Sequence, residues 1–307
     1  MNPLRSLVWK GEINVQIYVE ESLLIGGKQQ QHASSKPLLN LRFPRDTFLP
    51  MYLTSILNQL KLSLKYEIEK IIPRCWFSYN EKVLPWFLPI GVIFDMTMSN
   101  DIISRSNDTI KPTRRSIIST WPIKLHFKQK EETDRKLPYG FIPLIAGEGQ
   151  LESFWMHRWK QACFIMNGSS KIMMQLARHE TVSFWNSIKQ RDLDGFTEIS
   201  SKIIPASESG FRMVPIKYHL PYNNETNNFE SPIQPVVKLI QNDNSKGPIV
   251  LQDVILKDFP DLIDINGEFK GFMIAQGIIL QPSDSVYELY SSLLNIDGFL
   301  HIIISNS

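Results

Sequence analysis

The stretch FWMHRWKQACFIMNGSSK, residues 154–171, separates two parts of this chain that share one pattern of elements. Its apolar residues recur at i, i+4, i+7, i+8 and i+11, which are Trp155, Trp159, Ala162, Cys163 and Met166. Residues at this spacing share one helix face, so the stretch predicts a helix with one buried side. Gly168 interrupts the stripe, and Lys171 begins the next helix. Further apolar stripes at residues 172–176, 182–188 and 193–203 predict a block of three or four short helices that ends near residue 204.

Strand and helix patterns precede this block. Residues 9–19 and 39–43 alternate between apolar and polar side chains, which predicts two strands joined by a loose hairpin. From Phe48 the period becomes that of a helix, carried by Leu53, Ile56, Leu57, Leu60 and Leu64. A strand, its return, a short helix and a closing strand are then predicted, in that order, at residues 75–80, 83–86, 90–96 and 121–127.

The last hundred residues repeat this order. Two strands, a helix, two more strands, another helix and a final strand are predicted at residues 211–219, 233–239, 251–259, 269–280, 286–293 and 299–304. The order strand, strand, helix, strand, strand, helix, strand therefore occurs twice. We expect an α+β protein in which two similar domains flank a helix-rich domain.

The domain boundaries follow the glycines and the polar segments. Gly147 and Gly149 mark the end of the first domain, so the predicted domains span residues 1–146, 147–205 and 206–307. Three polar stretches have no strong period, at residues 99–120, 128–140 and 223–228. We interpret them as a surface insertion that is not a structural element, a linker and an asparagine-rich loop.

Composition favours a globular protein in a reducing compartment. Hydrophobic residues make up 43% of the 307, enough for sizeable cores. Cys75 and Cys163 lie in apolar segments without paired spacing, so we expect buried free thiols. The N-terminus lacks the apolar core of a secretion signal, and no apolar run reaches about 18 residues. We expect a soluble intracellular protein.

Charge is divided unevenly along the chain. Residues 1–204 carry 27 lysines and arginines against 19 acidic residues, a net +8, which leaves −6 for residues 205–307. Two solvated surfaces are the ordinary outcome of such a division. The alternative is a basic face for an anionic membrane surface, for which Arg178, Lys189 and Arg191 are the candidate contacts.

Signatures of catalysis are missing from the sequence. It has no Gly-x-Ser-x-Gly, no phosphate-binding Gly-x4-Gly-Lys-Ser/Thr and no His-Glu-x-x-His motif. The six histidines are scattered along the chain, so we expect no metal site and no cofactor. We also expect no nucleic-acid partner.

Two features invite a functional interpretation. Lys171 follows a glycine and two serines, small residues that leave its amine accessible for attack on a thioester, although a single exposed lysine is usually only solvated. The run LPWFLPIGVIFD, residues 84–95, is either a packed strand-to-helix turn or one wall of a groove for an amphipathic partner helix. The candidate groove residues are Trp86, Pro89, Ile90, Gly91 and Phe94.

Four motifs resemble a known family. They are Pro89-Ile90-Gly91-Val92-Ile93-Phe94-Asp95, Phe154-Trp155-x-His157-x-Trp159-Lys160-Gln161, Asn167-Gly168-Ser169-Ser170-Lys171 and Asp297-Gly298-Phe299-Leu300. Together they resemble the autophagy protein 5 family in its budding-yeast type, across both flanking domains and the helical block. The resemblance implies two ubiquitin-like β-grasp domains around a helix-rich domain. The three polar stretches match no motif of the family.

The resemblance also implies a function. Lys171 matches the position that forms an isopeptide bond with the C-terminal glycine of autophagy protein 12. The conjugate would bind a helix of autophagy protein 16. It would also act with the conjugating enzyme for autophagy protein 8 to promote the lipidation of that protein with phosphatidylethanolamine. Such a chain is ligase-like without being an enzyme by itself, and it is cytoplasmic and recruited to the membrane of the preautophagosomal structure.

Three alternatives remain at this level. A non-conjugated ubiquitin-like adaptor would only bind a partner helix. A ubiquitin-like modifier would need a flexible tail that ends in glycine, whereas this sequence ends Ile304-Ser305-Asn306-Ser307 directly after a predicted strand. A thiol-relay conjugating enzyme would need an exposed cysteine with a lowered pKa, and both cysteines are expected to be buried.

Overall fold

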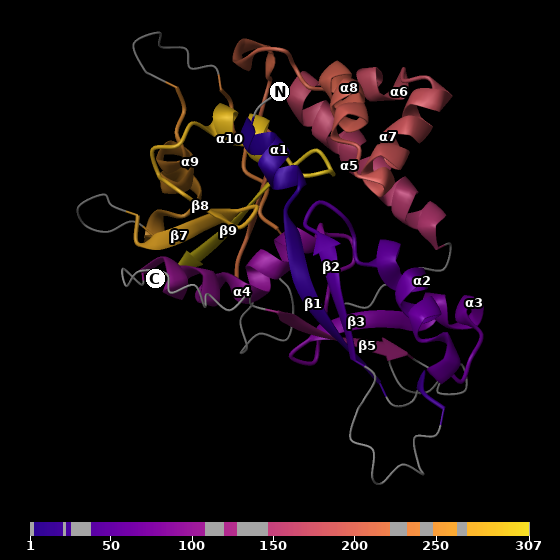
Figure 1. Ribbon diagram of the computed structural model, residues 1–307. Helices are drawn as coiled ribbons and strands as arrows, with labels where there is room; N and C mark the ends of the chain where they lie inside the picture. Colours follow the sequence, from indigo (N-terminus) through magenta and orange to yellow (C-terminus); the bar gives the residue numbers. More distant parts are fainter. Residues whose placement is uncertain are drawn as a thin grey trace, which may run out of the picture.

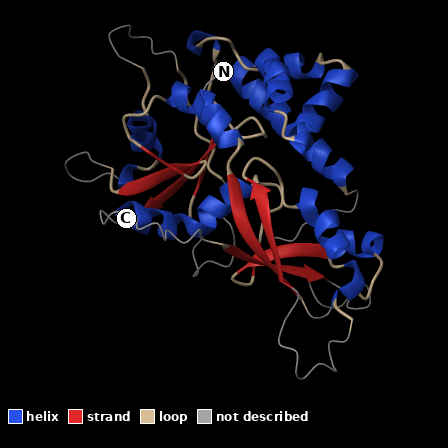
Figure 2. Ribbon diagram, in the orientation of Figure 1, coloured by secondary structure: helices blue, strands red, loops and turns tan. Residues whose placement is uncertain are grey.

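The computed structural model describes residues 3–20, 23–25, 38–107, 120–127, 147–221, 232–239, 248–262 and 269–306. Two separate sheets and a group of helices make up its architecture (Figures 1 and 2). The predicted linker at 128–140, residues 108–119 of the predicted insertion and the loop at 223–228 lie outside the described residues.

The first sheet is built from the N-terminal part of the chain. Its strand order is β2-β1-β5-β3-β4, in which β1 pairs parallel with β5 and the other pairs are antiparallel. The strands are β1 (Glu12–Val19), β2 (Leu38–Pro44), β3 (Cys75–Tyr79), β4 (Lys82–Val83) and β5 (Trp121–Phe127). The predicted strands at 39–43, 75–80 and 121–127 are confirmed. The predicted return at 83–86 ends at Val83, because Pro85 lacks the N–H that a longer ladder needs.

Apolar side chains on β1 alternate and supply the core of this sheet. Ile13, Val15, Ile17 and Val19 are buried, while the residues between them are more exposed. Helix α2 (Pro50–Gln59) adds its predicted stripe, and the short α3 (Ile68–Ile71) follows it. This domain therefore has its own hydrophobic core.

Helices at two places in this domain differ from the prediction. Residues Pro3–Trp9 form a helix, α1, so the predicted strand at 9–19 begins only at Glu12. Trp9 lies in α1, and the centroid of its ring lies 5.0 Å from that of Phe196. The alternation of apolar residues along 9–19 cannot reveal a contact with a residue so distant in the sequence. Helix α4 runs from Ile90 to Asn107, well beyond residue 96. The prediction that 99–120 is not a structural element is therefore wrong for 99–107: polar residues end an apolar stripe without ending a helix, and neither proline nor glycine occurs between Gly91 and Pro112.

Four helices form the middle block, as predicted. They are α5 (Glu148–Asn167), α6 (Lys171–Met174), α7 (Arg178–Gln190) and α8 (Leu193–Ile203). Their shared core is aromatic: Trp155 and Trp159 of α5 both pack on Phe184 of α7, and Phe184 contacts Phe196 of α8. The Asp192 side chain caps α8 by accepting a hydrogen bond from the Gly195 N–H.

The second sheet has the order β6-β9-β7-β8, with β6 and β9 parallel. Its strands are β6 (Ile216–His219), β7 (Gly271–Ala275), β8 (Ile278–Leu280) and β9 (Leu300–Asn306), with helices α9 (Leu251–Asp258) and α10 (Val286–Leu293). The predicted strand at 211–219 is shorter than expected. The strand predicted at 233–239 is wrong: Ile233 makes a single bridge to Tyr218, because Pro232 and Pro235 have no N–H to donate to a ladder.

Both faces of the second sheet are covered. Met273 of β7 and Ile302 of β9 belong to a core shared with the helical block, whereas Ile274 and Ile303, the next residue on each strand, belong to the core of the first domain. Adjacent residues of a strand face opposite sides of a sheet. Figure 1 shows α4 lying along β7 and β9, which it contacts. The second sheet is therefore packed between the other two parts of the chain.

Candidate functional site

Lys171 lies at the end of a short turn that joins α5 to α6. We call residues Asn167–Lys171 the acceptor turn. Lys171 is exposed and is the first residue of α6, a helix of four residues. Within the described residues its ammonium group has no hydrogen-bond or ion-pair partner. The amine is thus free to react with a group that approaches from solvent.

The backbone beneath Lys171 is held on both sides. Asn167 donates from Nδ2 to the carbonyl oxygen of Cys163 at 3.1 Å and to that of Ile203 in α8 at 3.0 Å. Gly168 closes α5 in the left-handed region, at φ 72°, and its N–H donates to the Phe164 carbonyl. The Lys171 N–H donates to Ser169 Oγ at 3.2 Å. An exposed side chain therefore extends from an anchored backbone.

Arg212, which the sequence interpretation missed, lies against this turn. Its N–H donates to the carbonyl oxygen of Met166 at 2.7 Å. A Cβ placed on Gly168 would lie 2.6 Å from Nη1 and 3.1 Å from Cδ of Arg212, so the guanidinium rests on the bare Cα of the glycine. No local spacing connects residue 212 with residue 168, so no pattern in the sequence predicts this contact.

Two of the four motifs meet behind the acceptor turn. The indole N–H groups of Trp155 and Trp159 both donate to the carbonyl oxygen of Ile296, each at 2.6 Å. Gly298, at φ 84°, lies so close to α5 that an added Cβ would come within 2.9 Å of the Ala162 Cβ. These motifs thus join the helical block to the C-terminal domain.

A buried polar relay extends from this junction. Asp297 accepts from His301 Nε2 at 3.0 Å, and His301 Nδ1 lies 2.8 Å from His219 Nε2. Burial lowers the pKa of both histidines, and it does so most strongly for His219. Burial also lowers the pKa of Lys217 to about 8, and its Nζ lies 3.7 Å from the centroid of the Phe299 ring. None of these four side chains is exposed, so the relay has no access to a substrate.

The five candidate groove residues are placed differently from one another. Pro89, Ile90 and Gly91 are buried, and the Gly91 N–H donates to the Arg45 carbonyl at 2.9 Å. Phe94 is half-buried and lies edge-on to Trp121, with ring centroids 5.8 Å apart. Only Trp86 and Phe94 therefore keep surface that another chain could contact, and the sequence prediction of a wall made of all five does not fit this burial.

Trp86 belongs to an aromatic cluster that the sequence did not reveal. We call Trp86, Phe87 and Phe154 the aromatic cluster. Its ring centroids lie 5.6 Å apart for Trp86 and Phe154 and 6.2 Å apart for Trp86 and Phe87. All three residues are half-buried, and the guanidinium of Arg158 lies 4.8 Å from the centroid of the Phe154 ring. The cluster lies where the N-terminal domain meets α5.

The three candidate membrane contacts do not form one patch. Arg178 is exposed at the first position of α7, and Lys189 near its end forms an ion pair with Glu148 at 2.8 Å. Arg191 points inward: its guanidinium donates to the carbonyl oxygens of Trp9 and Asp46 and lies 4.5 Å from the centroid of the Trp9 ring. Since a 13-residue helix is about 20 Å long, Arg178 and Arg191 lie far apart. The guanidinium of Arg191 is thus engaged by α1, and its contact with lipid stays a prediction.

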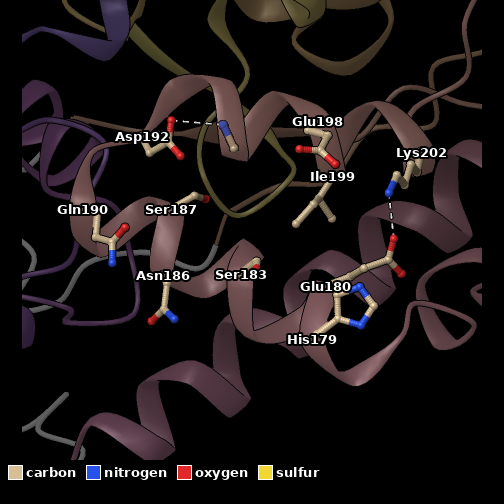
Figure 3. A pocket seen from close by; sticks show the side chains of 11 residues that line it. His179, Glu180, Ser183, Asn186, Ser187, Gln190, Asp192, Glu198, Ile199 and Lys202 are labelled. Carbon is tan, nitrogen blue, oxygen red and sulfur yellow. Dashed lines mark hydrogen bonds and ion pairs between the residues drawn. The ribbon is translucent and has the colours of Figure 1, made fainter.

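A polar cavity of about 470 Å³ lies between α7 and α8. Figure 3 shows its lining, which includes an ion pair between Lys202 and Glu180 at 2.7 Å. Small-molecule sites of this size are mostly apolar, whereas nearly all of the side chains here are polar or charged. The cavity thus differs in its lining from most small-molecule sites.

Both cysteines are free and buried, as predicted. Burial raises the pKa of Cys75 to about 12, and Cys163 is buried with its Sγ 3.3 Å from the Ser169 carbonyl oxygen. A thiol held in this way is a poor nucleophile. In the part of the chain that the structure describes, no three histidine, cysteine or acidic side chains gather as metal ligands would. None of the described helices is both long and apolar enough to cross a bilayer.

Comparison with known proteins places all three parts of the chain in one family. Residues 8–127 match the model "Autophagy protein ATG5, UblA domain", residues 148–206 match "Autophagy protein ATG5, alpha-helical bundle region", and residues 213–304 match "Autophagy protein ATG5, UblB domain". The predicted fold class, two ubiquitin-like domains that flank a helix-rich domain, is confirmed.

Individual relatives match this sequence along nearly its whole length. The chain is 33% identical over 306 residues to autophagy protein 5 of Vanderwaltozyma polyspora, covering 99% of this chain and 96% of that protein. It is 31% identical over 315 residues to autophagy protein 5 of Saccharomyces cerevisiae, covering 98% and 95%. A crystal structure of Kluyveromyces marxianus Atg5 superposes with a TM-score of 0.75 at 27% identity and covers 99% of both chains.

Proposed function

Because this chain belongs to the autophagy protein 5 family, we propose that it is a non-catalytic scaffold of autophagy that becomes joined through Lys171 to the ubiquitin-like autophagy protein 12. The observation that carries this proposal is the exposed amine of Lys171, which has no partner among the described residues and belongs to the anchored acceptor turn. A nucleophile whose backbone is fixed loses less entropy when it meets a bound thioester.

The proposed step is an acyl transfer. Lys171 Nζ, as the neutral amine, attacks the carbonyl carbon of the C-terminal glycine of autophagy protein 12, held as a thioester on its conjugating enzyme. A C–N bond forms, the C–S bond breaks, and the sulfur leaves with the conjugating enzyme. The proton lost by the amine passes to the leaving thiolate or to water. This chain supplies the amine and no cysteine of its own.

Reconstitution tests the acceptor. Autophagy protein 12, its activating and conjugating enzymes and ATP are mixed with wild type, Lys171→Arg or Lys189→Arg, and the products are resolved on a denaturing gel. Lys189 is a matched control, since it is an exposed lysine of the same helical block. We expect one shifted band with wild type and Lys189→Arg, and none with Lys171→Arg. A band of unchanged yield with Lys171→Arg would refute the assignment, and no band with wild type would favour the adaptor that only binds a partner helix.

The conjugate would also bind a helix of autophagy protein 16. The aromatic cluster supports this part of the proposal, because half-buried tryptophan and phenylalanine rings are frequent anchors of binding energy, and Phe94 remains a second candidate. Calorimetry with a synthetic peptide of that helix would measure the contribution of Trp86. We expect Trp86→Ala to weaken binding at least about tenfold, whereas Tyr18→Ala, at an exposed aromatic residue of β1, has no effect. Equal affinities for the two variants would place the groove elsewhere.

In the cell the conjugate would engage the conjugating enzyme for autophagy protein 8 and promote lipidation of that protein with phosphatidylethanolamine. It would be cytoplasmic and recruited to the membrane of the preautophagosomal structure. The family assignment supports this role, and so does the burial of both cysteines, which leaves the thioester chemistry to the conjugating enzyme. Fluorescent fusions of wild type and Lys171→Arg would test recruitment, and lipidated autophagy protein 8 on a gel would test activity. Normal lipidation with Lys171→Arg would contradict this role.

A further inference from the structure

The guanidinium of Arg212 lies against Gly168, three residues before the proposed acceptor lysine. It is exposed, and within the described residues it has no carboxylate and no hydrogen-bond acceptor for its side chain. Its position is nonetheless defined, because its own N–H is bonded to the Met166 carbonyl and its side chain lies across Gly168. The backbone of this arginine is anchored, and its guanidinium has no protein acceptor among the described residues. Its five N–H donors are therefore available for a ligand.

The left-handed glycine makes this placement possible. Any side chain at residue 168 would collide with Nη1 of Arg212, since even a Cβ would lie 2.6 Å from it. The guanidinium therefore lies on the peptide backbone of the acceptor turn rather than beyond it. A fixed donor next to a nucleophile is the arrangement that holds a substrate in a reactive pose.

Gly168, against which Arg212 packs, and Lys171 lie within the reach of a short piece of extended chain. Gly168 and Lys171 are three residues apart, so their Cα atoms are separated by at most about 10 Å. An extended tail covers about 3.3 Å per residue. A tail that ends at Lys171 and runs back over Gly168 would place the carbonyl oxygens of its preceding two or three residues near Arg212.

We propose that Arg212 binds the C-terminal tail of the incoming ubiquitin-like protein by donating hydrogen bonds to its backbone carbonyl oxygens, and so aligns the thioester with Lys171. This inference rests on the proposed function of Lys171. Arg212 takes no proton and forms no bond in the reaction. It positions the acyl group, which should raise the maximal rate of transfer more than the affinity between the two proteins.

A purely structural role would give a different result. A cation near the end of α5 also interacts favourably with the C-terminal end of the helix dipole. If that were its whole contribution, loss of Arg212 would lower the melting temperature and leave the rate of transfer unchanged. Kinetics and stability therefore need to be measured on the same variants.

The experiment is single-turnover transfer from the conjugating enzyme already charged with autophagy protein 12 to excess full-length acceptor chain. Rates are measured against acceptor concentration for wild type, Arg212→Ala, Arg212→Lys and Arg178→Ala, with melting temperatures for each. Arg178 is the control, an exposed arginine of the helical block that carries Lys171. Discharge of the charged enzyme onto free lysine confirms that each preparation of donor is equally active.

We expect Arg212→Ala to lower the maximal rate about tenfold, the loss associated with one hydrogen bond to a charged donor, while the half-saturating concentration changes less than twofold. Arg212→Lys should recover part of the rate, and Arg178→Ala should match wild type. A maximal rate for Arg212→Ala within twofold of that for Arg178→Ala would overturn the inference. A loss of maximal rate accompanied by an equal rise in the half-saturating acceptor concentration would also overturn it. Lys171→Arg distinguishes failure of the proposed function from failure of the inference about Arg212. If transfer survives in Lys171→Arg, the proposed function is refuted. If transfer is lost in Lys171→Arg but unchanged in Arg212→Ala, only the role of Arg212 is refuted.

Discussion

The carboxylate of Asp95 in α4 accepts a hydrogen bond at 2.9 Å from the backbone N–H of Gly277, in the turn between β7 and β8. The same carboxylate oxygen lies 2.5 Å from Nη2 of Arg45, which is also buried. Gly277 has φ 75°, and an added Cβ there would lie 3.2 Å from the Arg45 guanidinium. The carboxylate of Asp95, the last residue of the motif at 89–95, thus joins the two ubiquitin-like domains.

Replacing this carboxylate should destabilise the whole chain. Asp95→Ala leaves the guanidinium of Arg45 buried without its partner, and breaking a buried ion pair on one side typically costs about 3–5 kcal/mol in the free energy of unfolding. Glu12→Ala is the control, because it removes a carboxylate from an exposed pair with Arg42, where we expect a change below about 1 kcal/mol. Urea unfolding measures both variants. Similar losses in the two would contradict a structural role for the buried pair.

The buried histidine relay should make stability fall in mild acid. The folded-state pKa values of His219 and His301 lie below 6.5, so below pH 6.5 the unfolded chain binds more protons than the folded one. The contribution of the two histidines to stability is therefore complete above about pH 6.5 and declines as the pH falls, by about 1.4 kcal/mol per pH unit for each histidine until its lowered pKa is reached. The neighbouring charges that face the relay are Asp297, Lys217 and Arg158.

Urea unfolding at pH 7.5, 6.5 and 5.5 measures this dependence. We expect His219→Gln to flatten the slope below pH 6.5 relative to wild type, even if the variant is less stable throughout. His179→Gln, at an exposed histidine of α7, should keep the wild-type slope. Parallel curves for all three proteins would show that the relay does not titrate in this range.

Gly298 should tolerate no side chain. Gly298→Ala would force φ 84° on a residue with a Cβ and bring that atom within 2.9 Å of Ala162, so we expect a loss of about 2–4 kcal/mol. Gly149→Ala is the matched control in α5, since an added Cβ there meets nothing within 4 Å, and alanine favours helix by about 1 kcal/mol. Thermal unfolding would separate the two. A neutral Gly298→Ala would mean that α5 and the C-terminal domain pack less closely.

Neither cysteine should react in the native state. Cys163 is inaccessible, and the pKa of about 12 for Cys75 leaves almost no thiolate near neutral pH. Iodoacetamide followed by mass spectrometry should find no label on native protein at pH 7.5 and two labels after denaturation in urea. Rapid labelling of either native cysteine would revive the thiol-relay alternative.

Arg191 should behave as an anchor for α1. Arg191→Ala removes its hydrogen bonds to the Trp9 and Asp46 carbonyls and its contact with the Trp9 ring, so we expect a loss of about 2–4 kcal/mol in the free energy of unfolding. Arg178→Ala should leave stability unchanged. Chemical unfolding, together with co-sedimentation on anionic vesicles, would test both interpretations of Arg191. Full stability with reduced vesicle binding would restore it as a membrane contact.

Elements with local signals could be predicted from the sequence alone. The alternation at 121–127 gave β5 with its observed bounds, and the stripe through Trp155 and Trp159 gave α5. The acceptor turn was equally readable, because Gly168 followed by two serines ends a helix wherever the chain folds. Neighbouring residues decide periodicity and turn chemistry, so these features needed no partner.

The contacts between distant side chains became visible only in the folded protein. Trp9 fitted an alternating strand until its contacts with Phe196 and Arg191 placed it in a helix, and Arg191 had the charge of a lipid contact until it packed on Trp9. Ile233 and Val237 had the pattern of a strand, and the prolines beside them reduced the pairing to one bridge. Arg212 gained its place by Gly168 in the same way. Such contacts join residues tens to hundreds of positions apart, and they form because buried apolar faces of separate elements pack together, which no window along the chain can contain.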